Sequence, residues 1–217
     1  MIERVNQRVS ARPTEAPTPA EWRGVNAAHD EYRHVQLTGR YLSGQDVRVQ
    51  AVTTLGSGFW LLSPLELNDG SVVLINRGFV PPNWTPAPSD EYRLIGEPLV
   101  NVTGLLRLSE PHGGFLRSND PAAERWFSRD VTAIAEARGL HHVAPYFVDA
   151  EATASQTPEK PTFPVGGLTV IAFHNSHLVY ALTWFTLAFM VAGAGIYLAL
   201  QNAKQHDDTL STNNAAD

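Results

Sequence analysis

Two histidines stand directly before a long apolar run near the end of the chain. His174 and His177 bracket Asn175 and Ser176, and residues 178–200 after them contain no Asp, Glu, Lys, Arg or His. A neutral imidazole is a common metal ligand. Polar side chains at the end of an apolar helix can also form a simple interfacial cap. The residues alone leave both interpretations open.

The apolar run itself predicts a transmembrane helix. A helix of about 20 apolar residues crosses a hydrocarbon core of roughly 30 Å, and residues 178–200 are long enough for this. Tyr180 and Trp184 lie near one end and Tyr197 near the other. Aromatic residues are enriched at both membrane interfaces, so their positions support a membrane span.

One side of this helix carries small residues below His177. Steps of four and three residues from His177 reach Ala181, Trp184, Ala188, Ala192, Gly195 and Ala199. Small side chains let the backbone of another membrane helix approach closely. The pattern predicts a partner helix, with His177 at the head of the shared face.

The residues before the span predict a β-rich domain. Turn residues separate segments rich in Val, Leu, Ile and Thr, and this pattern is typical of strands: 32–42, 46–55, 58–67, 71–80, 98–108 and 143–152. Asn68-Asp69-Gly70 predicts a hairpin with a tight primed turn. Asp120 before Pro121, Ser128 or Asp130, and Gly139 are expected to cap short helices. The predicted fold class is α+β: an antiparallel, barrel-like sheet with a short helical insertion, followed by one C-terminal transmembrane helix.

The chain divides into segments of different composition. We expect an N-terminal helix end and proline-rich linker over 1–21, a β-rich extramembrane domain over 22–152, a linker over 153–172, the transmembrane helix over 173–200 and a polar tail over 201–217.

Composition excludes several classes of function. The chain has 217 residues, no cysteine and a net charge of −6 without a basic run, so thiolate chemistry and nucleic-acid binding have no basis. Phosphate-binding loops, nucleophile elbows and zinc-peptidase motifs are missing from the sequence, which predicts that the protein is not an enzyme. Asp149 and Glu151 are expected to be solvated carboxylates at a strand end.

The stretch Asn76–Pro81 is the best candidate for a polar site in the β-rich domain. Arg77 stands beside Gly78 at the end of an apolar strand. From there a guanidinium can bind a carboxylate or propionate bidentately. A structural salt bridge inside the domain is the alternative.

Several motifs occur in one order along the chain, and together they resemble the Surfeit locus protein 1 family of cytochrome c oxidase assembly factors. The resemblance covers residues 3 to about 200. The motifs that carry it are Gly39-Arg40-Tyr41, VVLINRGFVP ending at Pro81, the pattern from Asn119 to Asp130, VAPYFVD over 143–149 and NSHLVYALTWF over 175–185.

The resemblance implies a non-enzymatic role in building the haem a-containing subunit I of the oxidase. Its helix-head histidine matches His177, which would then ligate the iron of a transiently bound haem a. Tyr180 and Trp184 would pack on the porphyrin, and Arg77 would receive the propionates, while His174 ranks second as a ligand. The implied partners are subunit I, haem a synthase and membrane lipid. The alternative is a scaffold that clamps oxidase assembly intermediates without binding haem.

The sequence departs from the family pattern in three places. Phe79 replaces the usual tryptophan, and Ser176 replaces an asparagine. Family members have two spans, so we expect a first transmembrane helix upstream of Met1; the alternative is a version of the protein with a single span. The implied location is a bacterial inner membrane with the domain on the periplasmic side, or alternatively the mitochondrial inner membrane.

Overall fold

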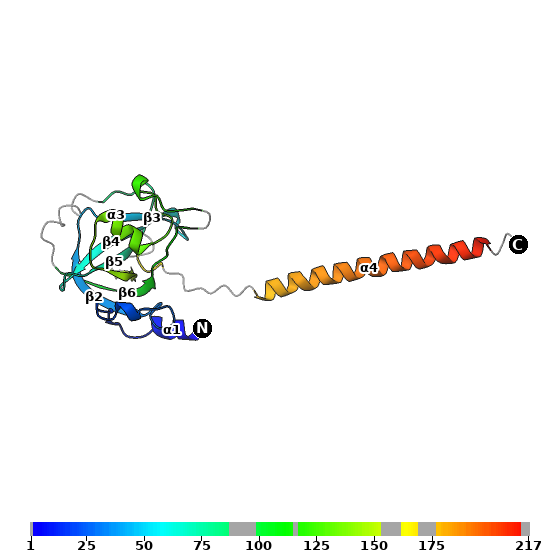
Figure 1. Ribbon diagram of the computed structural model, residues 1–217, viewed down its shortest axis with the longest axis horizontal. Helices are drawn as coiled ribbons and strands as arrows, with labels where there is room; N and C mark the ends of the chain where they lie inside the picture. Colours follow the sequence, from blue (N-terminus) through cyan, green and yellow to red (C-terminus); the bar gives the residue numbers. More distant parts are fainter. Residues whose placement is uncertain (1, 87–98, 115–116, 153–161, 169–176, 214–217) are drawn as a thin grey trace. The chain divides into compact units, whose positions relative to one another are not determined.

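A computed structural model describes residues 2–86, 99–114, 117–152, 162–168 and 177–213 (Figure 1). The chain forms two compact units, Met1–Val170 and Ile171–Asp217. The first unit contains the whole sheet, and the second contains one long helix. The two units are described separately below.

The first unit is built on a seven-stranded sheet with the order β1-β2-β6-β7-β5-β4-β3. The strands are β1 (Thr14–Glu15), β2 (His34–Tyr41), β3 (Val47–Thr53), β4 (Gly56–Leu67), β5 (Val72–Val80), β6 (Val100–Leu108) and β7 (Val143–Ala150). The predicted segments correspond to β2–β7, whereas the two-residue β1 was not predicted.

Five strands close into a barrel because β2 pairs with both β6 and β4. Closure through β2, β6, β7, β5 and β4 leaves no open edge within this ring. The predicted α+β, barrel-like fold is confirmed. The pairs β1–β2 and β5–β7 are parallel, and the remaining pairs are antiparallel.

The β4–β5 hairpin has the predicted turn residues but a different turn geometry. Gly70 has a φ of 76°, while Asn68 and Asp69 keep negative φ values. The side chain of Asp69 accepts hydrogen bonds from the backbone N–H and the hydroxyl of Ser71. A three-residue loop with glycine in the left-handed position therefore replaces the predicted primed turn.

Two apolar clusters hold the sheet. One contains residues from all five barrel strands, including Leu65, Ile75 and Val148. The other lies between the sheet and α3 (Val131–Arg138), where Trp126 and Ile134 are fully buried. Figure 1 shows α3 against the β3, β4 and β5 side of the sheet.

The helical insertion has the predicted capping residues. The Asp120 side chain accepts from Ala123 N–H at the start of η2 (Pro121–Ala123). Asp130 accepts from Ala133 N–H at the start of α3, and Gly139 ends α3 with a φ of 63°. Side-chain caps and a left-handed glycine satisfy backbone groups that a short helix leaves unpaired.

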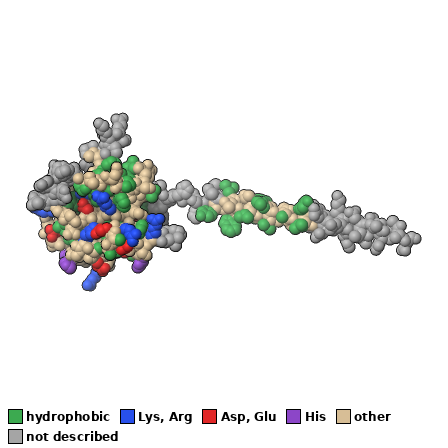
Figure 2. Space-filling model, turned by 90° about the horizontal axis from the view of Figure 1, so that it is seen from above, with side chains coloured by type: hydrophobic (Ala, Val, Ile, Leu, Met, Phe, Trp, Pro, Cys, Tyr) green, Lys and Arg blue, Asp and Glu red, His purple; other side chains and the backbone are tan. Residues whose placement is uncertain are grey.

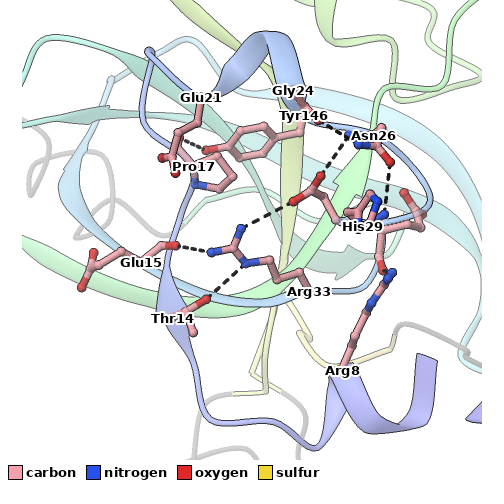
Figure 3. A network of polar contacts seen from close by, with 12 residues as sticks. Arg8, Thr14, Glu15, Pro17, Glu21, Gly24, Asn26, His29, Arg33 and Tyr146 are labelled. Carbon is pink, nitrogen blue, oxygen red and sulfur yellow. Dashed lines mark hydrogen bonds and ion pairs between the residues drawn. The ribbon is translucent and has the colours of Figure 1, made fainter. Parts of the chain in front are cut away.

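The N-terminal segment lies across the barrel and is held by side-chain hydrogen bonds (Figure 3). It comprises α1 (Ile2–Val9), β1 and η1 (Trp22–Gly24). Arg8 donates to the carbonyls of Ala28 and Glu31, and Arg33 donates to the carbonyl of Glu15. The buried Tyr146 hydroxyl of β7 donates to the carbonyl of Pro17 at 2.9 Å. The predicted helix is present, and the proline-rich part is bonded to the barrel.

Candidate functional site

The second unit begins its helix at one of the two candidate histidines. Helix α4 spans His177–Asn213, so His177 is its first residue, whereas His174 lies outside the described residues. Within α4, Tyr180–Leu198 is a candidate membrane span of 19 residues with a mean hydropathy of 1.7, and none of its side chains is buried. Figure 2 shows hydrophobic side chains along this helix. Length and composition therefore match the predicted transmembrane helix.

Two aromatic side chains follow His177 on the same side of α4. Tyr180 is 66% exposed and Trp184 is 71% exposed. In a helix, residues three, four and seven positions apart share one face, so positions 177, 180 and 184 form one stripe. The helical spacing thus keeps the position of His177 on the face that carries the two exposed rings, and a haem bound there remains a prediction.

The predicted small-residue stripe lies on exposed helix surface from Ala181 to Gly195, the part whose exposure the structure describes. A methyl group added at Gly193 or Gly195 would meet no other atom within 4 Å. The hydroxyl of Thr186 donates to the carbonyl of Leu182 at 2.8 Å, so this polar group is satisfied inside the helix. Such internal bonding is needed where water is absent. The partner helix remains a prediction.

Arg77 is the extra residue of a β-bulge in β5. Leu61 of β4 pairs with Gly78, while the next residue, Leu62, pairs with Asn76. Bulges bend a strand and redirect a side chain. The Arg77 guanidinium lies over the Tyr41 ring, 4.9 Å from its centroid. The bulge therefore directs Arg77 away from the regular ladder and onto an aromatic ring.

The stacked Arg77 side chain is half-buried and keeps its hydrogen-bonding capacity. No Asp or Glu in the described part of the chain forms an ion pair with it. Stacking uses the face of a guanidinium and leaves its N–H groups at the edge. Arg77 can therefore still donate to an incoming carboxylate.

A segment close to the helix in sequence is bonded to the barrel beside this bulge. Phe79 and Val165 exchange backbone hydrogen bonds of 2.9 Å, and Gly167 N–H donates to Ala150 C=O at 3.1 Å. Gly78 has a φ of 124°, and a Cβ there would lie 2.1 Å from the Val165 oxygen. Residues 162–168 thus bond to the ends of both β5 and β7.

A buried carboxylate also lies at the bulge. Asp149 of β7 is only 4% exposed, which contradicts the expectation that it is solvated, whereas Glu151 is exposed as expected. Asp149 accepts hydrogen bonds from Asn76 at 2.7 Å, from Arg107 at 2.9 Å and from Arg129 at 3.2 Å. Charged groups are buried only where they are paired and hydrogen-bonded, and Asp149 meets this condition.

The two arginines that bind Asp149 have further partners. Arg107 donates to Glu31 at 2.8 Å, and Arg129 donates to Glu110 at 3.1 Å. Their guanidiniums also lie over Tyr32 and Phe147 respectively, with atom-to-centroid distances of 4.6 and 4.7 Å. Three carboxylates thus surround two guanidiniums, so each guanidinium has two hydrogen-bonded carboxylate partners. The cluster stabilises the barrel wall behind the bulge rather than presenting a reactive group.

Acidification is expected to destabilise the barrel through this cluster. Burial alone raises the pKa of Glu110, but the hydrogen bonds and charge of Arg129 outweigh it and hold the pKa below its ordinary value of 4.5. A carboxyl with a lowered folded-state pKa adds stability above its unfolded pKa, and that stability is lost as the pH falls through the folded value. The Glu110→Gln variant should therefore have a lower free energy of unfolding than the wild type at neutral pH. Below about pH 4.5, its free energy of unfolding should fall less than that of the wild type. Urea unfolding across this range measures both effects, and parallel curves for the two proteins would contradict the prediction.

A single histidine is too few ligands for a bare metal ion but enough for the iron of a haem. The described residues contain no group of three or more His, Cys, Asp or Glu side chains that could hold an ion. A porphyrin already supplies the equatorial ligands of its iron, so one axial imidazole suffices. His177, together with the exposed rings of Tyr180 and Trp184, offers that donor set.

Comparisons with known proteins match both units of the chain to one family. A family model described as the SURF1 family matches residues 1–189. A SURF1-like protein of Monosiga brevicollis is 31% identical over 211 residues, which cover 91% of this chain and 76% of that protein. Surfeit locus protein 1 of Rattus norvegicus and of Homo sapiens are each 28% identical, over 86% and 87% of this chain. The chain spans less than two thirds of these two proteins, 62% and 64%.

Proposed function

The chain belongs to the SURF1 family of cytochrome c oxidase assembly factors, and on this premise we propose that it assists the insertion of haem a into subunit I of the oxidase, or stabilises it there. The observation that carries the proposal is the family match across residues 1–189, which includes the barrel, the bulge and the head of α4. The family consists of assembly factors rather than of enzymes.

Each candidate residue has a distinct role in this proposal. The His177 imidazole at the start of α4 ligates the haem iron, and the exposed rings of Tyr180 and Trp184 pack against the macrocycle. Arg77 donates to the propionates from its position over Tyr41. His174 is the second candidate ligand. Haem a is the group that the protein binds and passes on, and its redox reactions take place in the oxidase that receives it.

Membrane association follows from the same features. The span Tyr180–Leu198 anchors the protein in the membrane that contains the oxidase. The small residues of its predicted stripe, including Ala188 and Ala192, allow close packing against another membrane helix. The proposed partners are subunit I and haem a synthase. The proposed location is a bacterial inner membrane with the barrel on the periplasmic side.

Loss and restoration of oxidase assembly tests the proposed role. The gene for this chain is disrupted, and oxidase activity and the haem a content of isolated membranes are measured. We expect both quantities to fall, and to recover when the wild-type chain is supplied. Arg77→Met keeps an unbranched side chain but removes the cation, so it should restore haem a content only in part. Full assembly in the disrupted strain would overturn the proposal.

A second experiment separates haem handling from a scaffold role. The full chain is co-expressed with the enzymes of haem a synthesis and purified in detergent. Haem handling predicts a Soret band that copurifies with the chain. A chain that restores assembly but never carries a Soret band would support the scaffold alternative and contradict haem binding.

A further inference from the structure

The free edge of β3 has features of a peptide-binding edge. β3 is the last strand of the sheet and pairs with β4 on one side. On its other side, within the described residues, it pairs only near Val49, which forms a parallel bridge with Trp126, while Gln50 N–H donates to Trp126 C=O at 2.8 Å. Beyond this bridge, the last residues of β3 have no second neighbouring strand in the described part of the chain.

The backbone of Val52 faces this open side. Backbone groups of residues two apart in a strand point in the same direction. Because Gln50 N–H points away from β4 toward Trp126, the N–H and C=O of Val52 also point away from β4. Among the residues that the structure describes, neither group has a hydrogen-bond partner, so they present one donor and one acceptor to an incoming extended chain.

The end of this edge carries two exposed apolar side chains, whereas the start of β3 carries Arg48 and Gln50. Val52 is 85% exposed and Leu55 is 47% exposed, and in the described part of the barrel unit only Leu99 joins them as a strongly exposed large hydrophobic residue. Natural sheet edges are commonly protected by charges, prolines or bulges. The stretch 50–58 contains no charged residue and no proline. The exposed edge therefore suits a binding surface.

A groove of about 520 Å³ lies at this end of the sheet, and residues of both β3 and β4 line it together with Gly114, Arg117 and Phe127. Among its lining residues, Arg117 is the only charged one. Its guanidinium lies over the Phe127 ring, 5.4 Å from the centroid, and donates to the Gln50 side chain at 3.1 Å. These contacts hold Arg117 beside Gln50, two residues before Val52 on β3, and leave further N–H groups for a carboxylate.

We propose that this groove binds an extended, acidic peptide segment of a partner protein, which adds as a strand along Val52 and places a carboxylate on Arg117. Strand addition gives affinity through backbone hydrogen bonds and specificity through side-chain positions. The free donor and acceptor of Val52 favour a polypeptide over a lipid, and the single cation favours Asp or Glu in the peptide. The inference is independent of haem binding.

Peptide selection on the full-length chain in detergent tests the proposal. A phage-displayed library of random linear heptapeptides is selected on the wild type, Arg117→Glu and Val52→Pro. Proline removes the N–H of Val52 at an edge position where a strand tolerates it, and Val52→Thr serves as the control that keeps the N–H. We expect wild type and Val52→Thr to enrich peptides with Asp or Glu flanked by β-branched residues. Arg117→Glu should instead enrich Lys or Arg, and Val52→Pro should enrich no motif.

A synthetic peptide of the enriched sequence provides the quantitative test. Its affinity should fall about tenfold on Arg117→Glu, and its binding should slow hydrogen exchange at the Val52 amide about tenfold or more. Enrichment that neither substitution changes would overturn the proposal. A wild-type dimer that becomes a monomer on Val52→Pro would also overturn it, because the edge would then pair with a second copy.

Discussion

Asp149→Ala is expected to lower the free energy of unfolding of the barrel by about 3–5 kcal/mol, the usual cost of removing one partner from a buried ion pair. Asp149 is 4% exposed and accepts from Arg107 and Arg129 at 2.9 and 3.2 Å. Without it, both guanidiniums lose a charged partner in a partly buried site, and Asn76 loses its acceptor. Urea unfolding of the full chain, followed by the fluorescence of the buried Trp126, measures the change.

The matched control is Glu151→Ala, which removes an exposed carboxylate two residues further along the chain. Glu151 pairs with His34, and its side chain is 51% exposed. Exposed ion pairs contribute about 0–1 kcal/mol, so this variant should unfold close to wild type. Asp149→Asn keeps an acceptor of similar shape and should fall between the two alanine variants. Equal effects of Asp149→Ala and Glu151→Ala would show that the cluster does not stabilise the barrel.

Gly78→Ala is expected to detach the segment 162–168 from the barrel and to lower stability by about 2–5 kcal/mol, combining backbone strain with a steric clash. Gly78 has a φ of 124°, and the added Cβ would lie 2.1 Å from the backbone oxygen of Val165. That oxygen accepts from Phe79 N–H, so the bond at the bulge must break or β5 must move. Amide hydrogen exchange at Phe79 and Val165 should accelerate strongly.

Gly56→Ala separates the clash from the strain. Gly56 has a φ of 103°, but a Cβ there meets nothing within 4 Å. This variant carries only the conformational penalty, about 1–3 kcal/mol, and should leave exchange at Phe79 and Val165 unchanged. If both glycine variants leave the Val165 amide equally protected, the docking of the segment at the bulge is wrong.

The strands and the helix α3 could be predicted from the sequence because the residues that determine each of them lie within the element or at its ends. Strand composition located β2–β7, and Asp130 and Gly139 marked the two ends of α3. Closure of the barrel depends instead on the β2–β4 and β5–β7 pairings, which join strands that are not consecutive in the chain. No local pattern encodes such pairings, although the barrel-like class was predicted correctly.

The candidate site was predicted less completely, for physical reasons. Asp149 lies near the end of β7, where a carboxylate is expected to face solvent, and it is buried because Arg107 and Arg129 bind it from other parts of the chain. The glycine beside Arg77 did indicate an unusual strand end, but not that Arg77 is the extra residue of a bulge. Roles for His177, Tyr180 and Trp184 rest on helical spacing and family membership, and they remain predictions.

The central claim, that the chain holds haem a through His177, is tested most directly by the absorption spectrum of purified His177→Ala. The full chain and this variant are co-expressed with haem a synthesis, with His141→Ala, an exposed histidine of the barrel unit, as the control. We expect the haem per protein to fall and the iron spin state of any remaining haem to change in His177→Ala alone, because one axial imidazole is lost. Unchanged haem content and spin state in His177→Ala would contradict the claim, even if oxidase assembly continued.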